Sequence, residues 1–231
     1  GCVYRARQRS VDRSVALKVL KRELMEDETV VKRFFLEAKA ASRLTNPHTI
    51  TIYDFDRTSD GILYIAMELL HGIELRDKLL KGVPLPFVEI ARILDAVAES
   101  LAEAHDAGIV HRDMKPENVF LAELGDEREF VKVLDFGIAK AQKLSETRMT
   151  RTGVVSGTPA YMCPEAIMGD AVDASADIYA LGIMLYEMLS GTLPFTAETP
   201  MKLMLAQVQE DPQPVSVVNP DVHVPQPLHD F

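Results

Sequence analysis

The sequence has no tryptophan, only two cysteines and few aromatic residues, which make up 6% of the chain. Cys2 and Cys163 lie far apart and match no metal-ligand spacing, so we expect neither a disulfide framework nor a cysteine-based metal site. Such sparse cysteine favours a reducing compartment, and we expect a cytoplasmic location. No apolar run approaches membrane-spanning length, and the first residues lack the pattern of a signal peptide.

Positive charge is also in short supply. The 25 Lys and Arg residues stand against 35 Asp and Glu residues, which gives a formal net charge of −10. This balance argues against nucleic acid or an anionic membrane surface as the main partner. The chain does have length and apolar content, because 231 residues, 47% of them hydrophobic, can form one large domain or two small lobes with a sizeable core.

The pattern of apolar residues changes along the chain. The first part predicts a small sheet, with strand-forming residues clustered at 15–20, 49–54 and 62–68. One helix is expected there, because apolar residues from Val30 to Leu44 recur with a helical period. From about residue 70 the pattern is mainly helical, with helices at 86–107, 175–190 and 199–209 and short strands at 119–121 and 131–134.

Two later segments stand out. Residues 175–190 are apolar on nearly every side, so this helix requires cover on all its faces. Residues 140–159 are rich in Ser, Thr and Gly and follow no period, and a stretch of this kind inside a compact domain is usually functional. After Asp211 the chain is proline-rich, and we expect irregular structure.

The strongest chemical signal is the segment from His111 to Asn118, which reads HRDMKPEN. It places a carboxylate, a cation and an amide within six residues, between a helix and a strand. Phosphoryl transfer uses these groups to accept the proton of the attacking hydroxyl, to stabilise the moving phosphoryl group and to hold a metal. The alternative is a polar turn. Asp135-Phe136-Gly137 argues against it, because a carboxylate followed by glycine at a strand end can chelate a metal bound to phosphates.

These segments together resemble the eukaryotic-type protein Ser/Thr kinases, and bacterial members most closely. The matching motifs are Val15-Ala16-Leu17-Lys18, His111 to Asn118, Asp135 to Gly137, Gly157 to Met162 and Cys163-Pro164-Glu165. The resemblance implies an α+β bilobal fold, with a β-rich N-lobe at residues 1–68 and a larger helical C-lobe at residues 69–231. It also implies that Asp177, in the apolar helix, holds the catalytic loop.

The resemblance further implies a site for ATP and Mg²⁺. Catalytic roles fall on Asp113 as the base, Lys115 at the γ-phosphate, Lys18 at the α- and β-phosphates, Glu37 as the ion-pair partner of Lys18, and Thr158 as a bridge to Asp113 and Lys115. Metal binding falls on Asn118 and Asp135. The remaining nucleotide contacts are expected from Gly1 of the glycine-rich loop, Val3, Ala16 and Phe120 around the base, Met67 behind it, the backbone of Glu68 and Leu70, and Glu74 near the ribose.

The sequence departs from the family pattern at both ends. Gly1-Cys2-Val3 matches only the end of the glycine-rich loop, and Cys163 stands where a small residue is usual. The pattern also lacks the last two family helices and the Arg that pairs with Glu165. We therefore expect residues 1–231 to be a partial kinase domain, with an apolar patch on the helix at 175–190.

The expected function is transfer of the γ-phosphate of ATP to Ser or Thr hydroxyls of proteins. A small-molecule phosphotransferase is expected to have Gly in place of Arg112, and a non-catalytic scaffold typically loses Lys18, Asp113 or Asp135, all of which are present. The loop Arg148 to Thr152 offers hydroxyls in a basic setting. We expect phosphorylation of Thr150 and Thr152 by the enzyme itself, through self-association, with the phosphate pairing to Arg112.

Overall fold

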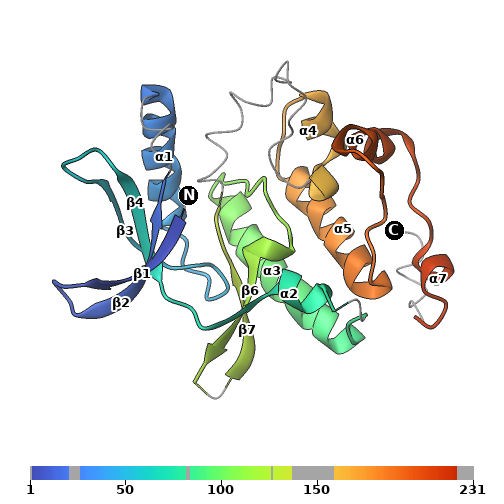
Figure 1. The fold of residues 1–231 in the computed structure, drawn as a ribbon, viewed down its shortest axis with the longest axis horizontal. Coiled ribbons are helices and arrows are strands. Elements are labelled where there is room, and N and C mark those ends of the chain that lie inside the picture. The colour runs from blue at the N-terminus through green and yellow to red at the C-terminus, as the bar shows by residue number, and fades with distance from the viewer. Residues whose placement is uncertain (1, 21–26, 82–83, 126, 137–158, 223–231) are drawn as a thin grey trace.

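The computed structural model describes residues 2–20, 27–81, 84–125, 127–136 and 159–222. Its first part is a four-stranded antiparallel sheet in the order β1-β2-β4-β3. The strands are β1 (Cys2–Gln8), β2 (Arg13–Val19), β3 (Ile52–Arg57) and β4 (Leu63–Glu68). Helix α1 (Glu28–Ala41) lies beside this sheet, as Figure 1 shows. The three strands and the helix expected from the sequence are therefore present.

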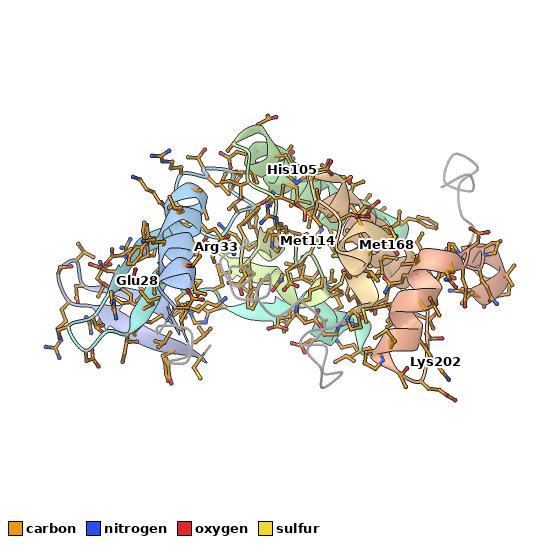
Figure 2. The ribbon with its side chains drawn as sticks, turned by 90° about the horizontal axis from the view of Figure 1, so that it is seen from above. Glu28, Arg33, His105, Met114, Met168 and Lys202 are labelled. Carbon is orange, nitrogen blue, oxygen red and sulfur yellow. The ribbon has the colours of Figure 1, made fainter. Side chains whose placement is uncertain are left out.

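The rest of the described chain combines a small sheet with helices. The sheet has the order β5-β6-β7, from β5 (Gly72–Glu74), β6 (Val119–Leu124) and β7 (Glu127–Val133). The helices are α2 (Leu75–Leu79), α3 (Phe87–Asp106), α4 (Pro164–Met168), α5 (Ser175–Ser190), α6 (Pro200–Gln209) and α7 (Val215–Val218). This sheet lies between the first sheet and helix α5 (Figures 1 and 2).

Helix α1 forms where a capping residue and an apolar stripe coincide. The Asp27 carboxylate accepts hydrogen bonds from the backbone N–H groups of Thr29 at 2.8 Å and Val30 at 3.4 Å, which satisfies two free donors of the first turn. Phe34 and Ala38, four residues apart, are fully buried on one face, and the Phe34 ring meets the Phe35 ring edge-on at 5.3 Å. The buried face fixes how α1 sits on the sheet.

Helix α5 is the centre of the helical part, but its cover is incomplete in the described residues. Its buried face includes Asp177, Met184 and Met188, while Ile178 is 59% exposed. An open groove of about 460 Å³ runs between α3 and α5, lined mainly by apolar side chains: Ala91, Leu94, Ala98, Ile178, Leu181 and Leu185. This groove is the apolar patch that the sequence predicts.

Four short elements differ from the expectation. β5, α2, α4 and α7 were not predicted, because segments of three to five residues are too short to show a period. α7 corrects the prediction of irregular structure after Asp211. Among the described residues, no helix has both the length and the apolar character needed to cross a membrane. The lobe boundary at residue 68 stays a prediction.

A pair of substitutions tests the packing of α1. Phe34→Ala leaves a cavity in a fully buried site and is expected to lower the free energy of unfolding by about 3–5 kcal/mol. Leu36→Ala, on the same helix but 68% exposed, should change it by less than about 0.5 kcal/mol. Denaturant titration of the two variants measures both values. Equal losses would contradict the orientation of α1.

Candidate active site

One buried carboxylate holds the candidate catalytic loop, the segment from His111 to Asn118. Asp177 of α5 accepts a hydrogen bond from the backbone N–H of His111 at 2.8 Å and another from that of Arg112 at 2.7 Å. His105, near the end of α3, places Nε2 2.8 Å from the same carboxylate. Arg112 has a φ of 61°, a backbone conformation that residues other than glycine rarely adopt and that costs free energy. The expected contact between Asp177 and the loop is therefore confirmed.

His111 joins the loop to the strand that leads to Asp135. Its ring is fully buried, which lowers the pKa of His111 and keeps the imidazole neutral. Nε2 lies 2.7 Å from the carbonyl oxygen of Leu134, which can only accept, so Nε2 carries the proton. Nδ1 then accepts from the backbone N–H of Asp113 at 3.3 Å. One neutral side chain thus links the backbones on which Asp113 and Asp135 sit.

Asp113, Lys115 and Asn118 form one cluster. Asn118 donates from Nδ2 to the backbone oxygen of Asp113 at 2.7 Å and to its Oδ2 at 3.4 Å. The Nζ atom of Lys115 lies 3.4 Å from the same Oδ2. Because Nδ2 makes both bonds to Asp113, the amide oxygen of Asn118 faces away from it. The cluster therefore presents a carboxylate, an ammonium group and an amide oxygen close together, as the sequence predicts.

The ion pair expected between Lys18 and Glu37 is not formed in this structure, and it stays a prediction. The Nζ atom of Lys18, on β2, lies 2.6 Å from Oδ2 of Asp135 instead. Glu37 Oε2 is buried without a hydrogen-bond partner. Burial raises the pKa of Glu37, although the charges of Arg112 and Arg33 act in the opposite direction. Lys18 is therefore paired with the carboxylate that follows β7, and not with the one on α1.

The other predicted nucleotide contacts lie on neighbouring strands. In the antiparallel register, Lys18 pairs with Val3, and Ala16 pairs with Met67. Met67 and Asp135 line one small internal cavity of about 10 Å³. Across the second sheet, Glu74 pairs with Phe120, while Leu70 follows β4 and is partly buried. Gly1, Thr158, Thr150 and Thr152 lie outside the described residues.

The candidate metal ligands suit a magnesium ion bound mainly through phosphates. In the described part of the chain, no three His, Cys, Asp or Glu side chains converge as they do in a closed metal site. Asn118 and Asp135 supply one amide and one carboxylate. Mg²⁺ is typically held by one or two protein oxygens together with substrate phosphates and water, so these two residues fit the ion.

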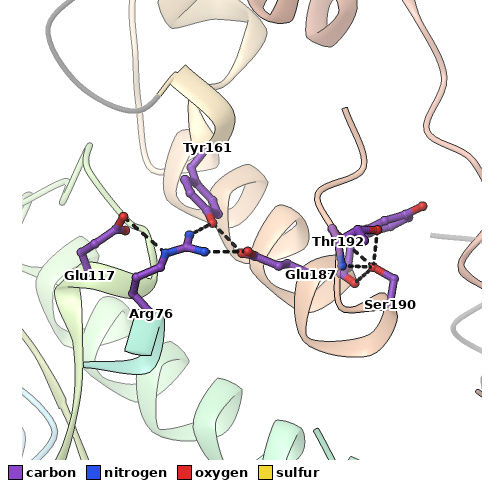
Figure 3. Close-up of polar contacts among 7 residues, drawn as sticks. Arg76, Glu117, Tyr161, Glu187, Ser190 and Thr192 are labelled. Carbon is purple, nitrogen blue, oxygen red and sulfur yellow. Dashed lines mark hydrogen bonds and ion pairs between the residues drawn. The ribbon is translucent and has the colours of Figure 1, made fainter. Parts of the chain in front are cut away.

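The sequence analysis missed a polar network around Arg76 of α2, drawn in Figure 3. Its Nη1 lies 2.7 Å from Oε1 of Glu187, its Nε lies 3.4 Å from Oε1 of Glu117, and its Nη2 donates to the Tyr161 hydroxyl. Tyr161 in turn donates to Glu187. Although burial opposes the charge, the bond to Glu187 raises the pKa of Arg76. The sequence signal that could have revealed this network is Glu187, the one glutamate in the apolar helix α5.

Known proteins share both the sequence and this arrangement. Residues 1–228 match the family described as protein kinase domain. The chain belongs to the protein kinase domain family. This kinase domain is 43% identical over 226 residues to serine/threonine-protein kinase pkn3 of Myxococcus xanthus, covering 97% of this chain and 41% of that protein. It is 38% identical over 220 residues to serine/threonine-protein kinase PrkC of Bacillus subtilis, covering 95% and 33%. The chain thus spans less than half the length of these two relatives.

The fold has a counterpart among solved structures. The crystal structure of the Mycobacterium tuberculosis PknI kinase domain is similar with a TM-score of 0.72 and 31% identity, covering 95% of this chain and 77% of that one. This likeness confirms the α+β bilobal kinase fold expected from the sequence motifs. The motif-based resemblance to bacterial Ser/Thr kinases is confirmed with it.

The buried carboxyl of Glu37 predicts a pH-dependent effect on stability. Because its pKa is raised above the ordinary 4.5, the folded protein holds that proton more tightly than the unfolded chain. The stability it contributes is full below pH 4.5 and is lost as pH rises through the folded pKa. Glu37→Gln should therefore raise the melting temperature of the nucleotide-free protein at pH 7, and this gain should shrink towards pH 4.

Glu28→Gln is the matched control, because Glu28 lies on the same helix, is exposed, and has its Oε2 atom 3.8 Å from Nζ of the exposed Lys32. Its melting temperature should follow the wild type at both pH values. A Glu37→Gln variant that melts below the wild type at pH 7 would show that the Glu37 carboxylate is favourably paired.

Proposed function

We propose that this kinase domain transfers the γ-phosphate of ATP to Ser or Thr hydroxyls of proteins. One observation carries the proposal: His111 holds the Asp113 cluster and the Lys18–Asp135 pair on two adjoining backbone segments. This arrangement puts a base and two cations beside a carboxylate suited to a metal. Transfer of a phosphoryl group depends mainly on such positioning and charge. The relatives named above are serine/threonine kinases, which supports the assignment.

In the proposed step, Asp113 accepts the proton of the substrate hydroxyl while the oxygen of that hydroxyl forms a bond to the γ-phosphorus. The bond between that phosphorus and the β–γ bridging oxygen breaks, and ADP leaves with the electron pair. Lys115, beside Asp113, stabilises the charge on the moving group. The Ser/Thr preference rests on Lys115 and Thr158, which the sequence places as the family motif does.

Asn118 and Asp135 are proposed to hold Mg²⁺, which when bound supplies positive charge that neutralises the phosphates. We expect Mg²⁺ to compete with Lys18 for the Asp135 carboxylate, because a divalent ion attracts a carboxylate more strongly than an ammonium group does. Lys18 moves to the α- and β-phosphates, and Glu37, the nearby carboxyl with an unsatisfied oxygen, becomes its partner. The described arrangement is accordingly a resting state of the site.

The nucleotide is proposed to lie between the two sheets. The base packs between Val3 and Ala16 of the first sheet and Phe120 of the second, with Met67 behind it. The backbone of Glu68 and Leu70 bonds the base, and Glu74 faces the ribose. Protein substrates, self-association and a cytoplasmic location belong to the same proposal.

A non-catalytic scaffold is the second candidate, because Lys18 is engaged by Asp135 and not by Glu37. The two candidates differ in one measurement. A scaffold binds nucleotide or a partner protein without transferring phosphate, whereas the kinase labels a protein substrate when given ATP with a labelled γ-phosphate.

Replacing the base tests the chemistry. In the full-length protein, Asp113→Asn should lower kcat by about 10²–10⁴-fold while ATP still binds, because the base acts mainly in the transition state. Lys18→Met should also abolish transfer, by misplacing the phosphates. Asp106→Asn, an exposed change at the end of α3, serves as the control. Near-normal turnover of Asp113→Asn would show that another group is the base.

Regulation is proposed to act through Thr150 and Thr152. These residues lie beside Arg148 and Arg151, and a phosphate on either would pair with Arg112 next to the base. Incubation with ATP followed by phosphopeptide mapping should find both sites. Thr150→Ala with Thr152→Ala should lower activity, whereas Thr147→Ala should not. An active enzyme that is unmodified at both sites and indifferent to the double change would overturn the proposal.

A further inference from the structure

A buried ion pair joins the two sheets beside the proposed adenine site. Lys132 of β7 places Nζ 2.8 Å from Oε1 of Glu68, the last residue of β4. The two side chains are only 7% and 16% exposed. Neither side chain takes part in the proposed chemistry, and the sequence analysis did not single out Lys132. A lysine this deeply buried requires an explanation, because removing its charge from water is costly.

The pair belongs to a series of hydrogen bonds that connects the two sheets with helix α3. Glu68 Oε1 also accepts a hydrogen bond from the backbone N–H of Thr51 at 2.7 Å, and the N–H of Glu68 donates to the Thr51 carbonyl at 3.0 Å. Lys132 Nζ donates to the Thr49 carbonyl at 3.3 Å. The Thr49 hydroxyl lies 2.6 Å from that of Ser100 on α3. Residues of both sheets and of helix α3 therefore share one polar network, which is buried at Lys132, Thr49 and Ser100.

Both residues of the ion pair are close in sequence to residues of the proposed nucleotide site. Glu68 begins the connection from β4 to β5, whose backbone is proposed to bond the base. Lys132 lies three residues before Asp135, on a strand where Val133 donates to the His48 carbonyl at 2.7 Å and accepts from Ile50 at 2.9 Å. The backbone that would bind adenine is thus fastened to the strand that leads to the candidate metal ligand Asp135, two residues beyond its end.

Stability alone does not account for such a pair, since well-packed apolar residues often replace a buried ion pair without loss. We propose that the Lys132–Glu68 pair is a positioning element for the nucleotide, which fixes the backbone of residues 68–70 against β7 so that the base and the phosphates are bound together. The inference rests on the proposed function. The inference concerns the side chains of Lys132 and Glu68. The backbone groups that are proposed to bond the base remain present when these side chains are replaced.

The decisive variant is Lys132→Met in the full-length protein. The KM for ATP should rise about tenfold, with kcat within about twofold and the KM for a protein substrate unchanged, because ground-state binding of the nucleotide is lost. The dissociation constant for ADP, measured by calorimetry, should rise by the same factor. Lys132→Arg retains the charge and should recover most of the ATP affinity.

Two further variants separate positioning from stability. Lys78→Met removes another partly buried lysine, which is paired with Glu89 and Glu129 and not with Glu68, and should lower the melting temperature without changing the KM for ATP. Combining Glu68→Met with Lys132→Met removes both charges. The double variant should regain melting temperature relative to Lys132→Met, yet keep the weak ATP binding.

Three results would overturn the inference. ATP and ADP affinities within about twofold of the wild type in Lys132→Met would reduce the pair to a stabilising contact. Recovery of affinity together with melting temperature in the double variant would do the same. A wild-type protein that binds no nucleotide would remove both proposals. If the wild type binds ADP but transfers no phosphate, only the proposed function fails, because the ADP titrations of the variants still test the pair.

Discussion

The arrangement of the site depends on the carboxylate of Asp177. It sits on the helix around which the larger part of the molecule packs, and both of its oxygens accept backbone N–H groups of the catalytic loop. Those bonds hold Arg112 in an unfavourable left-handed conformation, which turns the chain so that Asp113 faces the Lys115 and Asn118 side chains. A buried carboxylate that accepts from fixed backbone donors gives the loop a rigid base, and this loop carries the proposed catalytic residues.

Around this rigid base, the charged groups of the site are arranged for exchange of partners. Lys18 contacts Asp135, the carboxylate that is also proposed to hold the metal. Glu37 has one buried oxygen without a hydrogen-bond partner, and burial raises its pKa. The Arg76 guanidinium, by contrast, contacts Glu187, Glu117 and Tyr161, and it ties the segment at Tyr161 to α2 and α5. The site thus contains charged groups that are proposed to change partners, Lys18 and Glu37, beside a cation with several partners, Arg76.

Sequence alone predicted the elements and residues whose signals are local. The helix at Ser175–Ser190 was found with its observed bounds, because apolar residues and a terminal glycine mark it. The cluster of Asp113, Lys115 and Asn118 was found because the three residues fall within one short loop. The partner of Lys18 was not, because two carboxylates compete and tertiary placement decides between them. The Arg76–Glu187 contact spans 111 positions, and no period or spacing in the chain reports such a distance.

The unsatisfied carboxyl of Glu37 has a further consequence for the binding of nucleotide. A carboxyl with a raised pKa retains its proton into a higher pH range than an ordinary one, whereas a carboxyl paired with an ammonium group releases it. If Lys18 moves to Glu37 when the nucleotide enters, proton release accompanies occupancy of the site. The affinity for nucleotide then increases with pH through the acid range, and the heat of binding depends on the ionisation enthalpy of the buffer. A domain built for phosphate chemistry would in this way couple its ligand to solvent protons through a residue that never touches the ligand.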